Sequence, residues 1–342
     1  MAAHKLGRRL SVGLAVASLL LATAVTAPAD ATTPSPIAYH VSGNRIVDSA
    51  DNPFIVKGVD AVYGRFAGGD VAGYGLRNYQ NAQRDLDNLK AQNVNLIRVM
   101  VSYSQYTSGP LGSAEYLTEL DQVVLWVTQR GMVVELSQGW AGGPANVVTY
   151  VDLLGRRYSS NPLVWIKPDN EPSCNDGDIS KCTDWSYWQN TEQQYVQAIR
   201  RAGNTQPIVI NCVGWSWDCS QIASYPLGDS NLIYGSHWYG LGRAVFDAQQ
   251  AGWCDRFWAG LASRYAMVVD EVGLQSDPNA AHISPADWGA GFLDYATTWV
   301  KTRQGSGVIG FSDSWSDQNS MTNPDGTWNA WGQAFIGHYL SK

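Results

Sequence analysis

The sequence predicts an α/β fold, a (β/α)8 TIM barrel preceded by a small N-terminal β-hairpin. Eight short apolar segments recur between residues 54 and 311, and amphipathic segments of helical length separate most of them. No stretch between them resembles an interdomain linker. Apolar strands that alternate with helices form a parallel sheet covered on both faces. Eight such units fit a closed barrel better than an open doubly wound sheet, and no Gly-x-Gly-x-x-Gly motif follows any of them.

The first 31 residues have the features of a signal peptide. A basic start that includes Arg8-Arg9 precedes an apolar stretch over residues 10–25, and an A-x-A cleavage pattern ends at Ala31. The stretch is short for a membrane anchor, which needs about 20 apolar residues. The arginine pair also hints at the twin-arginine export route. We therefore expect residues 1–31 to be removed and the protein to be secreted to the extracellular space, with no membrane association afterwards.

Residues 32–53 are expected to form an N-terminal segment and the hairpin. Ser42-Gly43-Asn44 supplies its turn, and Asp51-Asn52-Pro53 marks its end. The barrel then occupies residues 54–342.

The barrel strands are read from the apolar runs. They are predicted at residues 54–59, 95–101, 132–136, 163–166, 207–211, 232–236, 266–270 and 307–311.

The helices are read from the segments between the runs. Apolar faces at 3.6-type spacing mark two of them, Leu117/Leu120/Val124/Val127 and Tyr195/Ala198/Ile199, and Ser284-Pro285 starts a third. The unit between the fifth and sixth strands is too short for a full helix. Residues 330–340 are expected to form the eighth helix.

Composition narrows the possible partners. Lys plus Arg number 23 and Asp plus Glu number 30, so the net charge is −7, and no basic run occurs. Such a chain is a poor candidate for binding nucleic acid or an anionic membrane. The chain has 15 Trp and 17 Tyr but only seven Phe. Trp and Tyr rings carry a polar edge, so this surplus suits a partly solvated surface better than a dry core. We expect a monomer that binds a neutral substrate.

The cysteines fit an oxidising compartment. Cys174/Cys182 and Cys212/Cys219 lie close enough in sequence to close short loops, which leaves Cys254 as a buried free thiol. No Cys-x-x-Cys motif and no pair of His at ligand spacing occurs, so we expect neither a metal site nor a cofactor.

The ends of the strands indicate where the chemistry lies. In such barrels the active site forms at the carboxyl ends of the strands. Glu171 follows the fourth strand and Glu271 ends the seventh, so the two face each other across a narrow mouth. Two facing carboxyl groups are what cleavage of a glycosidic bond requires. The sequence has no Gly-x-Ser-x-Gly elbow, which argues against a serine esterase. It has no His cluster, which argues against a metallohydrolase.

The motifs at five strand ends resemble glycoside hydrolase family 5, the cellulase family within the clan of (β/α)8 retaining glycosidases. The resemblance covers essentially the whole chain after the signal peptide. It rests on these matches: Arg98 in the second strand, Asn170-Glu171-Pro172 after the fourth, His237-x-Tyr239 after the sixth, Glu271-x-Gly at the seventh and Trp315 at the eighth.

The resemblance implies a role for each matched residue. Glu171 would be the general acid/base and Glu271 the nucleophile, held by Arg98 and Tyr239. The others would bind substrate: Asn170 would hydrogen-bond the sugar 2-hydroxyl, His237 would line the site and orient Glu171, and Trp315 would form the floor beneath the cleaved sugar. Asp169 and Asp270, next to the motifs, are interpreted as structural.

One position departs from the family pattern. Many members carry a His at the end of the third strand, where this chain has Ser137, Gln138 and Trp140. Besides Trp315, six tryptophans fall in or beside the predicted barrel-top loops, and we expect about half of them to stack on sugar: Trp140, Trp185, Trp188, Trp215, Trp217 and Trp238.

Three functional hypotheses remain open at this point. The first is a secreted retaining β-glycoside hydrolase acting within a β-1,4-linked polysaccharide, with glucan first and mannan second. The second is an exo-acting β-glycosidase of the same family. The third, of another class, is a non-catalytic carbohydrate-binding barrel, which the presence of both glutamates argues against.

Overall fold

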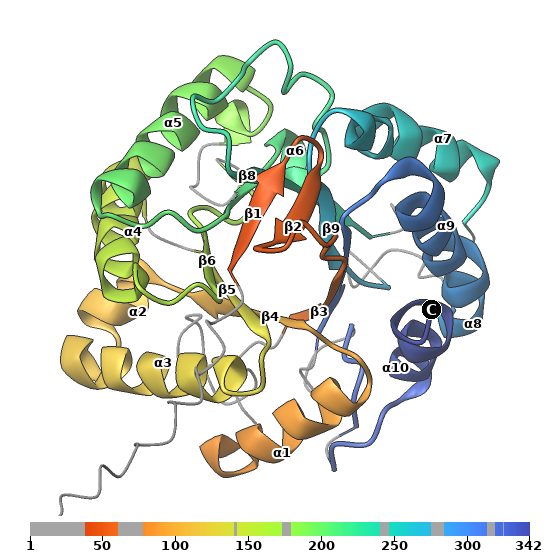
Figure 1. Ribbon diagram of the computed structural model, residues 1–342, viewed down its shortest axis with the longest axis horizontal. Helices are drawn as coiled ribbons and strands as arrows, with labels where there is room; N and C mark the ends of the chain where they lie inside the picture. Colours follow the sequence, from red (N-terminus) through yellow and green to blue (C-terminus); the bar gives the residue numbers. More distant parts are fainter. Residues whose placement is uncertain are drawn as a thin grey trace, which may run out of the picture. The chain divides into compact units, whose positions relative to one another are not determined.

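Eight parallel strands close on themselves around one interior. The computed structural model describes residues 38–60, 78–139, 142–172, 179–239, 246–274, 284–312, 319–323 and 325–342, all within one compact unit from residue 36 to residue 342. In it the strands pair in the order β10-β3-β4-β5-β6-β7-β8-β9 (Figure 1). They are β3 (Val56–Asp60), β4 (Leu96–Val101), β5 (Val133–Gln138), β6 (Val164–Lys167), β7 (Ile208–Asn211), β8 (Leu232–Trp238), β9 (Met267–Val272) and β10 (Gly307–Phe311). Every predicted run overlaps one of them, so the predicted TIM barrel is confirmed.

Helices form a ring around the barrel (Figure 1). They are α1 (Asn78–Ala91), α2 (Tyr103–Ser108), α3 (Gly112–Thr128), α4 (Pro144–Tyr158), α5 (Trp185–Arg201), α6 (Val213–Ser216), α7 (Ala248–Phe257), α8 (Pro285–Trp288), α9 (Asp294–Arg303) and α10 (Ala330–Phe335). Short 3₁₀ or π segments join them: η1 (Ile179–Lys181), η3 (Ala259–Ser263), η4 (Gly289–Leu293) and η5 (Ile336–Leu340).

The predicted helical features are found in these helices. The apolar faces on α3 and α5 point inward, with Leu120 and Tyr195 fully buried. Ser284 caps α8 by accepting a hydrogen bond from the Asp287 amide. The unit after β7 is the four-residue α6, as its short length predicted. The final predicted helix is split into α10 and η5.

One apolar layer fills the amino-terminal end of the barrel. Each strand contributes one buried side chain to it: Val56, Leu96, Val133, Trp165, Val209, Ile233, Val268 and Ile309. The predicted hairpin, β1 (Tyr39–Ser42) with β2 (Arg45–Asp48), is confirmed and closes this end. Tyr39 and Phe54 lie edge-on to the Trp165 ring, at centroid distances of 5.9 and 5.8 Å. The hairpin therefore seals the end of the barrel opposite the carboxyl ends of the strands.

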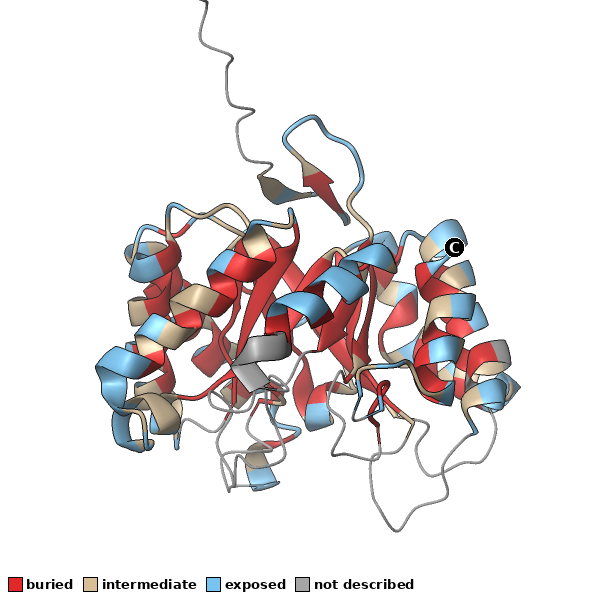
Figure 2. Cartoon of the chain, turned by 90° about the horizontal axis from the view of Figure 1, so that it is seen from below, coloured by how far each residue is buried: buried red, intermediate tan, exposed pale blue. Residues whose placement is uncertain are grey.

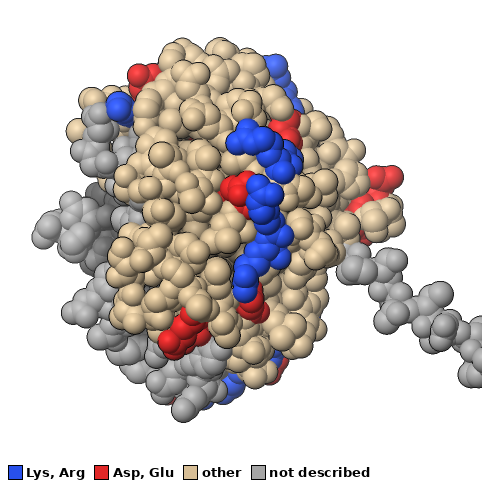
Figure 3. All heavy atoms as spheres, turned by 90° about the vertical axis from the view of Figure 1, so that its left-hand side faces the viewer, with Lys and Arg blue, Asp and Glu red and all other residues tan. Residues whose placement is uncertain are grey.

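Charged side chains of both signs lie on the outer surface. The barrel strands are almost entirely buried, whereas most of the surrounding helices show exposed residues on their outer side (Figure 2). On the face shown in Figure 3, basic and acidic side chains lie beside each other. Surface ion pairs such as Arg156–Asp152 and Arg157–Asp121 have this character. Among the described residues, no helix has the length and apolar character needed to cross a bilayer.

Candidate active site

Glu171 and Glu271 lie next to each other at the carboxyl ends of the strands. One carboxylate oxygen of each lies within 4.8 Å of the other, together with a ring nitrogen of His237. The Glu271 side chain is 8% exposed and that of Glu171 is 18% exposed. Both carboxylates are therefore largely buried. The more accessible one is on the loop after β6 and the more enclosed one is on β9.

A bulge in β9 brings two adjacent acids to the barrel interior. Between β8 and β9 the register runs Ser236 to Val269 and then His237 to Glu271, so Asp270 is an extra residue on β9. In a regular strand, successive side chains would point to opposite faces. The bulge re-aims this segment, so that Asp270 and Glu271 both contact interior residues.

Glu171 occupies an unusual backbone conformation. Its φ is +57°, in the left-handed region that few residues other than glycine adopt. Its amide donates to Oδ1 of Asn211 at 3.3 Å, and the preceding Asn170 amide donates to the Gln138 carbonyl at 2.7 Å. Strain of this kind is concentrated at functional sites, where neighbouring contacts maintain it.

Two groups hold the Glu271 carboxylate. Arg98 on β4 places Nη1 2.5 Å from Oε2, and the Tyr239 hydroxyl donates to Oε1. Burial alone would raise the pKa of Glu271. His237 when protonated, Arg98, Lys167 and the Tyr239 hydrogen bond act against burial and lower it to about 2. Glu271 is therefore a carboxylate at any pH near neutrality.

The same guanidinium orients Asn170. Arg98 Nη2 donates to Oδ1 of Asn170 and, at 3.2 Å, to the Ser137 hydroxyl. Arg98 is fully buried, and it thereby links the loop after β6 to Glu271 on β9.

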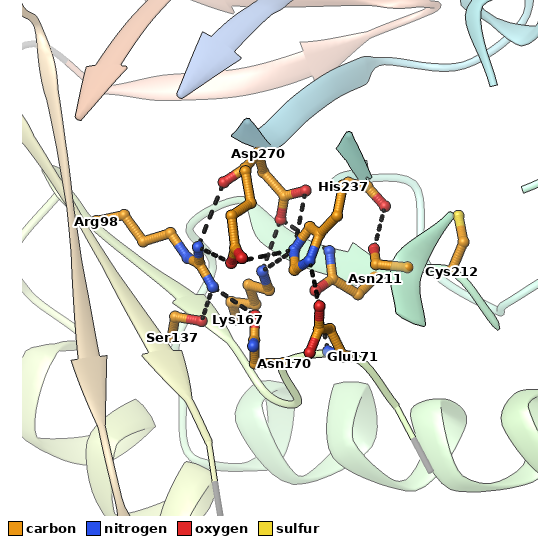
Figure 4. A network of polar contacts seen from close by, with 12 residues as sticks. Arg98, Ser137, Lys167, Asn170, Glu171, Asn211, Cys212, His237 and Asp270 are labelled. Carbon is orange, nitrogen blue, oxygen red and sulfur yellow. Dashed lines mark hydrogen bonds and ion pairs between the residues drawn. The ribbon is translucent and has the colours of Figure 1, made fainter. Parts of the chain in front are cut away.

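His237 contacts the other glutamate. Its Nδ1 lies 2.9 Å from Oε1 of Glu171, and its Nε2 lies 3.3 Å from the Lys167 ammonium (Figure 4). The structure thus brings together six of the seven residues named from the sequence. Trp315 lies outside the described residues.

Five charged or polar residues of this cluster were not assigned to the site from the sequence: Asp60, Glu135, Lys167, Asn211 and Asp270. Asp60 pairs with Arg98 at 2.6 Å, and Lys167 pairs with Asp270 at 2.7 Å. Glu135 lies 3.6 Å from the Arg98 Nε. Burial raises the pKa of Asp60 and of Glu135 to about 7, although Arg98 and Lys167 lower both. A sequence signal was present, because each charge interrupts or ends an apolar run.

These charges form a second layer above the apolar one. Arg98, Glu135, Lys167, Asn211 and Asp270 each stand two residues after a member of the apolar layer. With a side-chain period of two, both layers face the barrel interior. The barrel therefore changes from apolar at its closed end to densely charged below the two glutamates.

Glu171, His237 and Glu271 lie close enough to share a metal ion. Their surroundings suit proton transfer better. Both Glu271 oxygens already accept hydrogen bonds, and the Lys167 ammonium lies 3.3 Å from the histidine nitrogen that faces inward. A divalent cation would have to sit beside two fixed positive charges.

The loop tryptophans differ in their positions. Trp185, Trp188 and Trp238 are buried and pack in the core, Trp217 is partly buried, and Trp215 is 47% exposed. Trp140 lies outside the described residues. Trp215 lies in the segment from Gly214 to Ser216, in which each residue has a φ near +60°. Stacking on sugar is thus still open for Trp215 and Trp217, whereas the three buried rings pack the core.

The Cys212–Cys219 disulfide closes this loop, as predicted. Cys254 is a buried free thiol. Cys182 is disulfide-bonded too. Its predicted partner, Cys174, lies outside the described residues, so that pairing stays a prediction.

Comparison with known proteins agrees with this geometry. The family described as Cellulase (glycosyl hydrolase family 5) matches residues 47–308. No curated protein matches the chain. The fold is similar to that of a β-glucanase from Saccharophagus degradans solved with cellotetraose, with a TM-score of 0.73 at 21% identity over 90% of this chain and 94% of that one.

Two further solved structures share the fold. An endocellulase from Pyrococcus horikoshii has a TM-score of 0.69 at 16% identity, over 91% of this chain and 100% of that one. The catalytic domain of a Thermobifida fusca endoglucanase has a TM-score of 0.70 at 16% identity, over 89% and 97%. The family match spans well over half of the chain. The chain therefore belongs to the cellulase family, glycosyl hydrolase family 5, and is a glycoside hydrolase.

Proposed function

We propose that this protein is a secreted, retaining β-glycoside hydrolase that cleaves β-1,4-linked glucan at internal bonds. The observation that carries the mechanism is the approach of Glu171 and Glu271 to within 4.8 Å. Retaining enzymes place their carboxyl groups about 5–5.5 Å apart, whereas inverting enzymes leave about 6.5–9.5 Å for a water molecule. The spacing favours direct attack by one carboxylate.

The two glutamates differ in the way that the two steps require. In the first step the Glu271 carboxylate attacks the anomeric carbon, and Glu171 gives its proton to the departing glycosidic oxygen. This yields a covalent glycosyl ester on Glu271 and a free leaving-group hydroxyl. In the second step the Glu171 carboxylate takes a proton from water, which attacks the anomeric carbon and releases Glu271. The low pKa of Glu271 suits a nucleophile, and the more exposed Glu171 can reach both the leaving group and water.

The remaining site residues orient the substrate in this proposal. Asn170, fixed by Arg98, would hydrogen-bond the sugar 2-hydroxyl. Arg98 and Tyr239 would keep Glu271 ionised, and Trp315 would form the floor beneath the cleaved sugar. No step in this mechanism needs a cofactor.

The substrate is proposed from the structural neighbours. The Saccharophagus degradans β-glucanase and the Pyrococcus horikoshii endocellulase were both solved with cellotetraose. A soluble β-1,4-glucan is thus the first substrate to test, acted on by a monomer in the extracellular space. Mannan, xylan, galactan and aryl β-glycosides complete the panel. Internal cleavage would yield mixed oligosaccharides, whereas an exo-acting enzyme would release a single small product.

Proton NMR within the first minutes of hydrolysis tests the mechanism. Two successive inversions give net retention, so a β-glycoside should first release the β-anomer, before mutarotation. If the α-anomer appeared first, Glu271 would not be the nucleophile. Failure to hydrolyse any member of the panel would instead favour the non-catalytic carbohydrate-binding barrel. Secretion is checked separately, by sequencing the amino terminus of protein recovered from the culture medium, which should begin after Ala31.

A further inference from the structure

Lys167 and Asp270 form an ion pair enclosed in the barrel. Lys167 Nζ lies 2.7 Å from Asp270 Oδ2, and both side chains are 0% exposed. Asn211 Nδ2 donates to the same oxygen at 2.8 Å. A side-chain carbon at Gly235 would lie 2.4 Å from that oxygen, so a glycine there leaves room for the carboxylate. A buried ion pair is weak evidence for stability, because desolvation offsets the attraction. The position of the Lys167–Asp270 pair, next to the residues of the candidate active site, suggests a role in the reaction.

The lysine also contacts the histidine that serves Glu171. Lys167 Nζ lies 3.3 Å from His237 Nε2. An ammonium paired with a carboxylate carries three N–H donors and no lone pair. Nε2 must therefore accept, and in a neutral imidazole the single proton is then on Nδ1. Nδ1 lies 2.9 Å from Glu171 Oε1, so this N–H donates to Glu171.

Without the lysine, the imidazole would face carboxylates on both sides. Nε2 lies 3.6 Å from Glu271 Oε2 and 3.7 Å from Asp270 Oδ1, and Glu171 lies at the other nitrogen. Negative groups this close favour the imidazolium. A full positive charge beside Glu171 would hold it as a carboxylate, which a general acid cannot be when the leaving group departs.

The other charged groups of the cluster act at longer range. Arg98 on β4 donates to the Asp270 carbonyl at 3.5 Å as well as to Glu271. Glu135 on β5 lies beside Arg98 and adds negative charge near Asp270. Asn211 on β7 is neutral. Lys167 is thus the cation whose contact with Nε2 opposes protonation there.

We propose that Lys167 is a positioning residue that holds His237 in the neutral Nδ1–H form, so that the imidazole donates one hydrogen bond to Glu171 without placing a full positive charge beside it. This inference rests on the proposed acid/base role of Glu171. Arg98, Lys167 and the Tyr239 hydroxyl remain to keep Glu271 ionised when His237 is neutral.

The first test is the pH profile of Lys167→Met. With the ammonium removed, His237 should gain a proton and stabilise the Glu171 carboxylate. The alkaline limb of kcat/KM on a cello-oligosaccharide should then move to lower pH by about 1–3 units. A dinitrophenyl β-glycoside needs little protonation of its leaving group, so its glycosylation step should change much less.

Two further variants separate this effect from general damage. The double variant Lys167→Met/Asp270→Asn also lacks one of the carboxylates that face Nε2. Its alkaline limb should therefore lie between that of Lys167→Met and that of the unaltered enzyme. Lys57→Met is the matched control, because Lys57 also lies on a barrel strand but its ammonium donates to the Leu340 carbonyl. It should leave the limb unchanged. An alkaline limb in Lys167→Met that coincides with that of the unaltered enzyme would overturn the proposal.

The second test needs no enzymatic activity. Nitrogen-15 NMR of histidine-labelled protein reports which ring nitrogen carries the proton, and the His237→Asn spectrum identifies the His237 signals. The unaltered protein should show a protonated Nδ1 and an unprotonated Nε2 at neutral pH. A protonated Nε2 would refute the assignment. Because this spectrum is independent of turnover, an enzyme inactive on every glycan would reject the proposed function while the role of Lys167 was still decided.

Discussion

Arg98 and Glu271 form an ion pair in which a fully buried guanidinium lies 2.5 Å from a carboxylate that is 8% exposed. The pKa of Glu271, which burial would raise, is lowered to about 2 in this setting. A group whose pKa is lowered on folding contributes stability that is present above its unfolded value, about 4.3, and is lost as the pH falls toward 2. Glu271 thus favours the folded state at neutral pH as well as serving the reaction.

We expect Arg98→Lys to move the acid limb of activity to higher pH. Lysine keeps one charge but loses the planar fork that serves Asp60, Glu271 and Asn170 together. The pKa of Glu271 should rise toward its ordinary value, so kcat/KM should fall off at a pH about 1–3 units higher. The free energy of unfolding should drop by up to about 3–5 kcal/mol, because a buried pair is broken.

The matched control is Arg156→Lys, which alters an exposed ion pair with Asp152 on α4. It should change neither the acid limb nor, beyond about 0.5 kcal/mol, the stability. An Arg98→Lys profile that coincides with this control would show that Arg98 does not set the charge of Glu271.

The two glutamates should respond differently to removal of their charge. Glu271→Gln should abolish turnover on every substrate, because no covalent ester can form. Glu171→Gln should lose about 10²–10⁴-fold on a natural glycan but keep the first step on a dinitrophenyl β-glycoside. Added azide should rescue this second variant, since a small anion needs no general base, and should yield a β-glycosyl azide. Steady-state rates with and without azide provide the measurement.

Glu115→Gln, at an exposed position on α3, is the control for this pair and should behave as the unaltered enzyme. Equal losses in both active-site variants, with no azide effect, would contradict the division of labour between Glu171 and Glu271.

The sequence predicts the functional residues at the strand ends better than the charged layer in the barrel interior below them. Glu171 and Arg98 could be placed because apolar runs locate the strands, and motifs mark their ends. The β9 bulge could not be predicted, since it depends on how β9 pairs with β8 and β10. Regular alternation after Val268 would place Asp270 in the barrel interior, and the bulge is what brings the adjacent Glu271 to the interior as well.

Glu135 and Lys167 were missed for a different reason. Glu135 interrupts an apolar run in β5 and Lys167 ends one in β6. Hydrophobic periodicity treats a single charge in such a run as an exception. Only the closed barrel shows that such exceptions on neighbouring strands stand at the same height and neutralise one another. Their partners are distant in sequence, so no local spacing could reveal them.

Glu135 should make stability depend on pH. Burial raises its pKa to about 7, although Lys167 and Arg98 lower it. A carboxyl group with a raised folded pKa costs no stability below its unfolded pKa, about 4.3. The cost grows as the pH rises from there to the folded pKa of about 7 and is complete above it. Ionised Glu135 should therefore cost stability at pH 8, by an amount on the order of 3 kcal/mol. Glu135→Gln removes this cost. Its free energy of unfolding, relative to that of the unaltered protein, should therefore be higher at pH 8 than at pH 5.

Urea unfolding at the two pH values measures this gain, with Glu115→Gln as the control for loss of a surface carboxylate. If the difference between pH 5 and pH 8 is the same in Glu135→Gln as in the unaltered protein, Glu135 is already ionised at pH 5 in the folded state.

The Cys212–Cys219 disulfide should support both stability and the position of Glu171. It joins residues seven apart and closes a loop in which Gly214, Trp215 and Ser216 have positive φ. Asn211, next to Cys212, accepts from the Glu171 amide. Replacing both cysteines by serine should lower the free energy of unfolding by about 2–3 kcal/mol, as expected for so short a loop. It should also lower kcat more than it raises KM, because the loop positions an acid rather than the bulk of the substrate. Cys254→Ser, which alters the buried free thiol, is the control for loss of a sulfur atom and should spare kcat.

Thiol counting under denaturing conditions should find one free cysteine in the exported protein. A count of three would mean that Cys174 and Cys182 are not paired, and a count of five would contradict both disulfides.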